Sequence, residues 1–204
     1  VQAPVSVLMS TFNRAHYIEQ AVCGILNQTL PPAQIIIVID GSTDETATIL
    51  EAYRDRITCL EQDNAGKSAA LNRALSLVTQ EFVWIFDDDD IAMPDALARH
   101  LRAFDTHPEV GFTYSPYIRA VTASDGSLVP VEEQQEECPD IATEEVVPRL
   151  LGSCFMLQQG SLVRTRCFRE VGGYREDYIR SLDYDYLLRL ARRFPAARID
   201  EPTF

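Results

Sequence analysis

The sequence predicts an α/β fold with a doubly wound, mostly parallel central sheet flanked by helices. Short β-branched or aromatic runs alternate with helical patterns through the first half of the 204 residues, as expected for a parallel sheet with right-handed crossovers. The run 82–86 is apolar at every position, which is typical of a strand buried on both faces. These two observations favour a sheet that helices cover on both sides.

The first half of the chain supplies four predicted strands and the helices between them. Pro31 and Pro32 interrupt the chain before the second strand, and Ser42 or Thr43 can cap the helix that follows it. The predicted strands cover 5–10, 35–39, 57–60 and 82–86, and the predicted helices cover 17–26, a segment ending near 53, the region 70–78 and a segment beginning near Pro94.

The second half of the chain has a less regular pattern. A hairpin is expected around 124–127, and the acidic segment 132–145 is interpreted as a mobile surface loop that leads into a helix. No repeat or linker is visible, so we predict one domain over residues 1–204. The remaining predicted elements are strands at 110–114 and 160–163, a helix at 143–151, a glycine turn at 171–174 and a helix at 183–190.

The charge balance limits the classes of partner. The chain has 18 basic and 31 acidic residues, for a net charge of −13. This charge argues against nucleic acid or an anionic membrane surface as the main partner. A phosphate-bearing ligand would need a metal ion to bind in such a field.

Cysteine usage and the chain ends indicate a cellular context. The five cysteines are widely spaced with no CxxC pair, which favours reduced thiols in the cytoplasm. No apolar stretch reaches the roughly 20 residues of a membrane helix. The chain begins without Met, so we expect a piece of a longer protein. Any attachment to the inner face of a membrane would then use segments outside this sequence.

Four consecutive carboxylates, 87–90, follow the apolar run directly. Ligands of open α/β sheets bind beyond the carboxyl ends of the strands. Adjacent carboxylates repel one another, and a cation that prefers oxygen ligands, Mg²⁺ or Mn²⁺, would relieve this repulsion. The alternative is a solvated acidic turn. The chain contains neither a GxGxxG segment after the first strand nor a P-loop, so dinucleotide and P-loop folds are poorly supported.

Several polar segments together resemble motifs of the family 2 glycosyltransferases, which are inverting enzymes of the GT-A fold. Each motif is weak by itself, but their common order extends over nearly the whole chain. The resemblance implies a nucleotide-sugar-binding half, 1–110, and a smaller acceptor-binding half, 111–204. The matching segments are 10–14 (Ser-Thr-Phe-Asn-Arg), 39–44 (Ile-Asp-Gly-Ser-Thr-Asp), 64–72, 87–90, 160–165, 171–174 and 183–190.

The resemblance implies a pocket for the nucleotide base after the first two strands. Thr11, Phe12, Arg14 and Asp40 match the positions that hold the base, with Phe12 stacking on it and Asp40 accepting a hydrogen bond from a base N–H. Two simpler interpretations stay open at this stage. Phe12 could be a core aromatic residue, and Arg14 could be an ordinary solvent-facing cation.

The resemblance also implies contacts to the phosphates, the sugar and a metal. Asn64 and Lys67 match a segment that approaches the nucleotide and its phosphates, although Lys67 could also be an ordinary surface cation. Asp87 and Asp88 match positions that touch ribose or sugar. Asp89 matches the ligand of Mn²⁺ or Mg²⁺.

Asp183 matches the catalytic base of the family, which removes the proton of an acceptor hydroxyl. The alternative is that Asp183 only caps its helix. Asp185, two residues further along, points to another helix face and is expected to be structural.

The resemblance therefore implies transfer of a sugar, a UDP-sugar being favoured, to a glycan, lipid-linked or small-molecule acceptor in polysaccharide or cell-envelope synthesis. Two departures affect the nucleotide-binding motifs: Ile39 replaces a common Asp, and Leu71 replaces a frequent Arg. A nucleotidyltransferase and a non-catalytic nucleotide-sugar-binding module are the alternatives. The first loop has no glycine, which counts against a nucleotidyltransferase.

Overall fold

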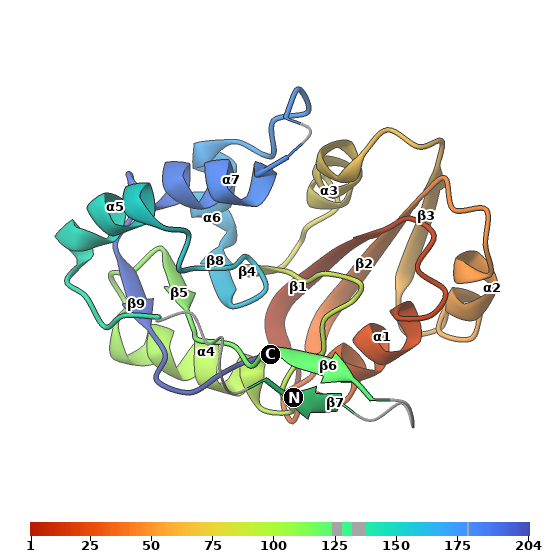
Figure 1. Cartoon of the computed structure of the whole chain (residues 1–204), viewed down its shortest axis with the longest axis horizontal. Helices are drawn as coiled ribbons and strands as arrows, with labels where there is room; N and C mark the ends of the chain where they lie inside the picture. The colour runs from red at the N-terminus through yellow and green to blue at the C-terminus, as the bar shows by residue number, and fades with distance from the viewer. Residues whose placement is uncertain (124–127, 132–137, 179) are drawn as a thin grey trace.

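The computed structural model describes residues 1–123, 128–131, 138–178 and 180–204. The described residues form a seven-stranded sheet with the order β3-β2-β1-β4-β8-β5-β9 (Figure 1). β8 is antiparallel to both of its neighbours, and the other strands run in one direction. The strands are β1 (Ala3–Thr11), β2 (Pro32–Asp40), β3 (Thr58–Gln62), β4 (Phe82–Ile85), β5 (Phe112–Tyr114), β8 (Ser161–Arg164) and β9 (Ala196–Arg198).

Helices cover both faces of the sheet, as Figure 1 shows. Alternate residues of β1 point to opposite faces. Val7 belongs to a buried cluster with residues of α1, α2 and α4, and Leu8 belongs to a second cluster with residues of α3, α5, α6 and α7. This arrangement confirms the predicted α/β class. The helices are α1 (Ile18–Leu26), α2 (Thr46–Glu51), α3 (Lys67–Leu75), α4 (Ala96–Thr106), α5 (Thr143–Gly152), α6 (Thr165–Val171) and α7 (Leu182–Ala191).

The directions of the strands bring several loops to one edge of the sheet. β1, β2 and β4 are parallel neighbours, so their carboxyl ends, at Thr11, Asp40 and Ile85, lie together. Since β8 runs the opposite way beside β4, its amino end at Ser161 faces the same edge. The four aspartates after β4 therefore lie near the residues that precede β8.

The structure adds elements that the sequence pattern did not predict. α6 begins directly after β8 without an intervening loop, and β9 has only three residues, two of them alanine. Neither segment is long enough to show a clear hydrophobic period. The expected hairpin agrees with β6 (Ala120–Thr122) and β7 (Leu128–Pro130), which flank 124–127 and form an antiparallel pair, while the predicted turn itself lies outside the described residues. Much of the predicted acidic loop, 132–137, is also outside them.

Two further features bear on the context of the chain. Within the described segments, no helix combines the length and the apolar content needed to cross a bilayer. The five cysteines are free thiols, of which Cys167 is buried.

Candidate functional site

A cavity of about 250 Å³ opens at the edge of the sheet where β1, β2 and β4 end. Its walls come from the ends of β1 and β2, from the loops after β1 and β4, and from the start of α3. All the predicted site residues except Asn64 and Asp183 line it. The lining residues are Ser10, Thr11, Phe12, Arg14, Asp40, Lys67, Asp87, Asp88 and Asp89.

Hydrogen bonds fix the loop after β1 against the loop after β2. Asn13 adopts a left-handed conformation (φ 54°), and its side-chain oxygen accepts a bond of 2.8 Å from the Thr43 N–H. The Arg14 N–H donates to Thr46 Oγ1 at 3.0 Å. These contacts hold Phe12 at the mouth of the cavity, where it is 47% exposed. Phe12 is therefore not a core aromatic residue.

Asp40 is buried at the end of β2 and holds the loop that leads into α3. One carboxylate oxygen accepts bonds from Gln62 Nε2 (2.7 Å) and the Ala65 N–H (2.9 Å). The other accepts a bond from the Gly66 N–H at 2.8 Å. Asp40 thus lines the cavity and also organises the segment that presents Lys67.

The turn after Asp40 is expected to be sensitive to a single methyl group. Gly41 has a φ of 77°, and a Cβ at this position would lie 2.7 Å from the backbone nitrogen of Asn64. A residue with a Cβ atom in the left-handed conformation costs about 1–2 kcal/mol, and the clash with the Asn64 backbone adds to this cost. We expect Gly41→Ala to lower the melting temperature by roughly 4–10 °C in calorimetry.

The matched control for this prediction is Gly152→Ala. Gly152 ends α5, and a Cβ there would meet no atom within 4 Å. This control should melt close to wild type. A Gly41→Ala protein as stable as wild type would contradict the steric explanation.

Asn64 itself is exposed and does not line the cavity.

Asp87, like Asp40, is held in the cavity by three donors. Lys67 Nζ lies 2.7 Å from Asp87 Oδ1. Gln158 Nε2 donates to Oδ1 at 2.8 Å, and Gln159 Nε2 donates to Oδ2 at 2.6 Å. The two glutamines are buried and immediately precede Gly160 and β8. Lys67 is therefore part of the site rather than an unattached surface cation.

Asp88 occupies a different environment from Asp87. It is buried, and its Oδ1 lies 3.7 Å from Arg14 Nε. Burial, together with the charges of Asp89 and Asp87, raises the pKa of Asp88 to about 6, although Thr11 and Arg14 favour the charged form. Arg14 also approaches Asp89 at 3.7 Å, so it balances two carboxylates at the cavity wall.

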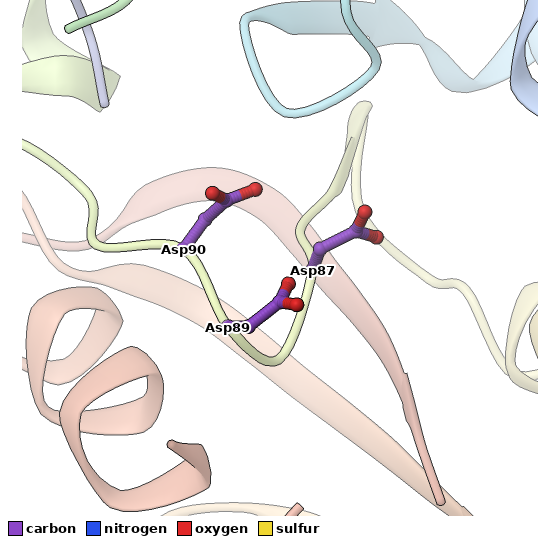
Figure 2. Close-up of side chains that lie close together, drawn as sticks. All are labelled: Asp87, Asp89 and Asp90. Carbon is purple, nitrogen blue, oxygen red and sulfur yellow. The ribbon is translucent and has the colours of Figure 1, made fainter. Parts of the chain in front are cut away.

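Asp87, Asp89 and Asp90 form a three-carboxylate cluster. Their side chains project from the loop after β4 (Figure 2), and one oxygen from each lies within 4.8 Å of the others. Burial and the charges of Asp87 and Asp89 raise the pKa of Asp90 to about 6. Three oxygen ligands with excess negative charge fit Mg²⁺ or Mn²⁺. The predicted ligand Asp89 is in this cluster, and Asp88 is not.

The raised pKa of Asp90 predicts that the variant Asp90→Asn changes the stability of the protein in a pH-dependent way. A raised folded-state pKa means that the charge of Asp90 destabilises the metal-free protein above pH 6, and that the penalty disappears near pH 4. We expect Asp90→Asn in EDTA to be more stable at pH 7.5 by about 1–2 kcal/mol, allowing for partial exposure. Thermal melts at both pH values measure this gain. An equal or lower melting temperature at pH 7.5 would refute it.

Asp183 lies in the first turn of α7, outside the walls of the cavity. Among the described residues its half-buried carboxylate has no hydrogen-bond or ion-pair partner, so it does not cap the helix. Burial and the charges of Asp87 and Asp183 together raise the pKa of Tyr174 well above its usual value. Tyr174 thus lies within electrostatic reach of both carboxylates.

Asp185 has the structural surroundings that its position predicts. Its Oδ2 accepts a bond of 2.8 Å from Arg189 Nε, and Arg189 also donates to the carbonyl groups of Val171 and Gly173. Asp185 therefore helps to fix the glycine turn that precedes Tyr174.

Ser10, Gln158 and Gln159 belong to the site but were not among the predicted residues. Asp90 was predicted only as part of the aspartate run 87–90, without a role of its own. The glutamine pair stands directly before an apolar strand, but its location depends on β8 being antiparallel. No local pattern in the sequence specifies that direction.

Comparisons with known proteins agree with this architecture. The model of the family "Glycosyl transferase family 2" matches residues 6–164. Glycosyltransferase GlyG of Streptococcus pneumoniae is 30% identical over 201 residues, which cover 90% of this chain and 65% of GlyG. A chondroitin synthase of Pasteurella multocida is 27% identical over 190 residues, covering 92% of this chain and 19% of that protein. The chain thus spans less than two thirds of the length of these relatives.

Two solved structures have the same fold. S. aureus TarS 1–349 in complex with UDP-GlcNAc superposes with a TM-score of 0.74 at 21% identity, covering 96% of this chain and 55% of that one. The mannosyltransferase PcManGT from Pyrobaculum calidifontis, in complex with GDP-Man and Mn²⁺, gives a TM-score of 0.68 at 20% identity, covering 98% of this chain and 57% of that one. These likenesses confirm the predicted GT-A fold.

Proposed function

Because the chain belongs to glycosyl transferase family 2, we propose that it transfers a sugar from a nucleoside-diphosphate sugar to an acceptor hydroxyl, with inversion at the anomeric carbon. The observation that supports this most strongly is the common cavity. It gathers Thr11, Phe12, Arg14 and Asp40 with Lys67 and with Asp87, Asp88 and Asp89 of the aspartate run, residues that the family resemblance assigns to the donor and the cation.

The donor would bind across the carboxyl edge of the sheet. The exposed ring of Phe12 is available for stacking on the base, beside Thr11 and Asp40. Lys67 and Arg14 supply positive charge where the diphosphate would lie. We favour a UDP-sugar, since TarS structures contain UDP and UDP-GlcNAc, although PcManGT was solved with GDP-Man.

Asp87, Asp89 and Asp90 would hold Mn²⁺ or Mg²⁺. When bound, the ion would stabilise negative charge on the departing diphosphate. In the metal-free protein, Lys67 offsets the charge of Asp87 and Arg14 offsets that of Asp89. We therefore expect donor and cation to bind cooperatively, because each supplies charge that the other needs.

Asp183 would act as the general base. The acceptor oxygen attacks the anomeric carbon, its proton passes to the Asp183 carboxylate, and the bond from that carbon to the diphosphate oxygen breaks. A partly buried carboxylate without a partner among the described residues is free to accept this proton. The acceptor would be a glycan, a lipid-linked sugar or a small molecule, and polysaccharide or cell-envelope synthesis is the proposed setting.

Incubation with UDP-, GDP-, CDP- and dTDP-sugars plus Mn²⁺, with and without candidate acceptors, tests this function. We expect one donor to yield free nucleoside diphosphate and a glycosylated acceptor. Consumption of a nucleoside triphosphate with a sugar phosphate would instead indicate a nucleotidyltransferase. Binding of donor without turnover across the acceptor panel would support a non-catalytic module.

A further inference from the structure

A closed ring of hydrogen bonds links the donor side of the cavity to the acceptor half. Lys67, at the start of α3, contacts Asp87 Oδ1 at 2.7 Å, and Gln158 Nε2 donates to the same oxygen at 2.8 Å. The Tyr174 hydroxyl donates to Gln158 Oε1 at 2.8 Å. Asn72, also on α3, pairs with both backbone groups of Tyr174 at 2.8 Å. The ring thus begins and ends on α3.

The ring depends on the close approach of Asn72 to the glycine turn. A Cβ on Gly173 would lie 2.2 Å from Asn72 Oδ1, the atom that accepts the bond from the Tyr174 N–H. Glycine at this position therefore allows α3 to hold the backbone of Tyr174. The Tyr174 side chain is then directed to Gln158.

The Tyr174 hydroxyl keeps the Gln158 amide in one orientation. Both residues are buried, at 4% and 2% exposure, so the amide oxygen has little access to water. The hydroxyl donates to Oε1, which leaves the Nε2 donor directed at Asp87. Without this hydroxyl, Oε1 would be a buried acceptor without its donor, and Gln158 could satisfy it only by turning away from Asp87.

We propose that Tyr174, acting through Gln158, is a positioning residue that holds the Asp87 carboxylate in the orientation needed to bind the cation and the donor. This inference rests on the proposed function, because it assumes that Asp87 serves in the three-carboxylate cluster. Groups that hydrogen-bond to metal ligands commonly affect metal affinity about 10- to 100-fold. Neither Tyr174 nor Gln158 needs to touch the substrate for this role.

Tyr186 offers a matched control for Tyr174. The two rings belong to the same buried cluster, with centroids 5.2 Å apart. The Tyr186 hydroxyl is buried without a hydrogen-bond partner among the described residues. Tyr186→Phe therefore removes the same atom from the same aromatic environment without breaking the ring of hydrogen bonds.

The experiment titrates Mn²⁺ alone, with free Mn²⁺ followed by electron paramagnetic resonance. We expect Tyr174→Phe to weaken Mn²⁺ binding about 3- to 10-fold, as loss of one hydrogen bond implies. Gln158→Met should weaken it about 10- to 100-fold. Tyr186→Phe should bind as wild type does. The double variant Tyr174→Phe with Gln158→Met should match Gln158→Met alone, because Tyr174 acts through Gln158.

A second measurement is independent of metal and donor. In NMR spectra, the Gln158 side-chain NH₂ group should exchange slowly in wild type and in Tyr186→Phe, and faster in Tyr174→Phe. Unchanged exchange in Tyr174→Phe would overturn the proposal, as would unchanged Mn²⁺ affinity or additive losses in the double variant. Wild-type protein that binds no Mn²⁺ would count against the metal site of the proposed function itself.

Discussion

Asp183→Asn is expected to lower kcat for sugar transfer by about 10²–10⁴-fold, the usual contribution of a positioned general base. This loss corresponds to about 3–5 kcal/mol of transition-state stabilisation. Asparagine preserves the shape of the side chain but cannot accept the proton of the acceptor hydroxyl. Because Asp183 lies outside the walls of the donor cavity, binding of nucleotide and cation should be unchanged.

Steady-state kinetics with a fixed donor and variable acceptor measure this effect. Asp105→Asn is the matched control, since Asp105 is an exposed residue near the C-terminal end of α4 that does not line the cavity. It should have wild-type kcat. If Asp183→Asn retained full activity, the role of Asp183 as the base would be wrong. If it lost nucleotide binding, Asp183 would belong to the donor site instead.

Asp89→Asn is expected to abolish metal-dependent donor binding, with an affinity loss of at least about 100-fold. Asp89 is the most exposed member of the three-carboxylate cluster, and within the described part of the chain it approaches Arg14 at 3.7 Å but has no hydrogen bond like those of Asp87. We therefore expect it to contribute charge and a ligand atom to the proposed cation rather than support to the fold. Removal of one carboxylate from a site with three strongly weakens the binding of a hard cation.

Titration of Mn²⁺ and donor into Asp89→Asn measures this prediction, with Asp105→Asn again as the control. The melting temperature of metal-free Asp89→Asn should equal or exceed that of wild type, because a repulsive charge has been removed. Binding that persists with wild-type affinity and metal dependence would exclude Asp89 as a ligand.

The parts of the site that follow directly from strand ends could be predicted from the sequence. Thr11, Asp40 and Asp87 each lie at or just beyond the carboxyl end of a strand, and parallel strands bring such residues to one edge. The apolar run before Asp87 was sufficient to identify the strand. Local sequence was therefore enough to predict that these residues lie at one edge of the sheet.

The residues that hold the site carboxylates in place could not be predicted in the same way. Gln158 and Tyr174 are far from Asp87 in sequence. Gln158 reaches Asp87 because β8 runs antiparallel to β4, and Tyr174 reaches Gln158 from the turn after α6. The orientation of the Gln158 amide depends in turn on one distant hydroxyl. Such features arise from tertiary packing, which short sequence patterns do not encode.

Calorimetric titration of UDP, GDP, CDP and dTDP, each in Mn²⁺ and in EDTA, tests the central claim most directly. That claim is that the cavity lined by Phe12, Asp40, Lys67 and the residues 87–89 binds a nucleoside diphosphate with a cation. The account predicts binding of one nucleotide, with UDP favoured, that is strong in Mn²⁺ and weak in EDTA. Absence of binding by all four nucleotides in Mn²⁺ would contradict it.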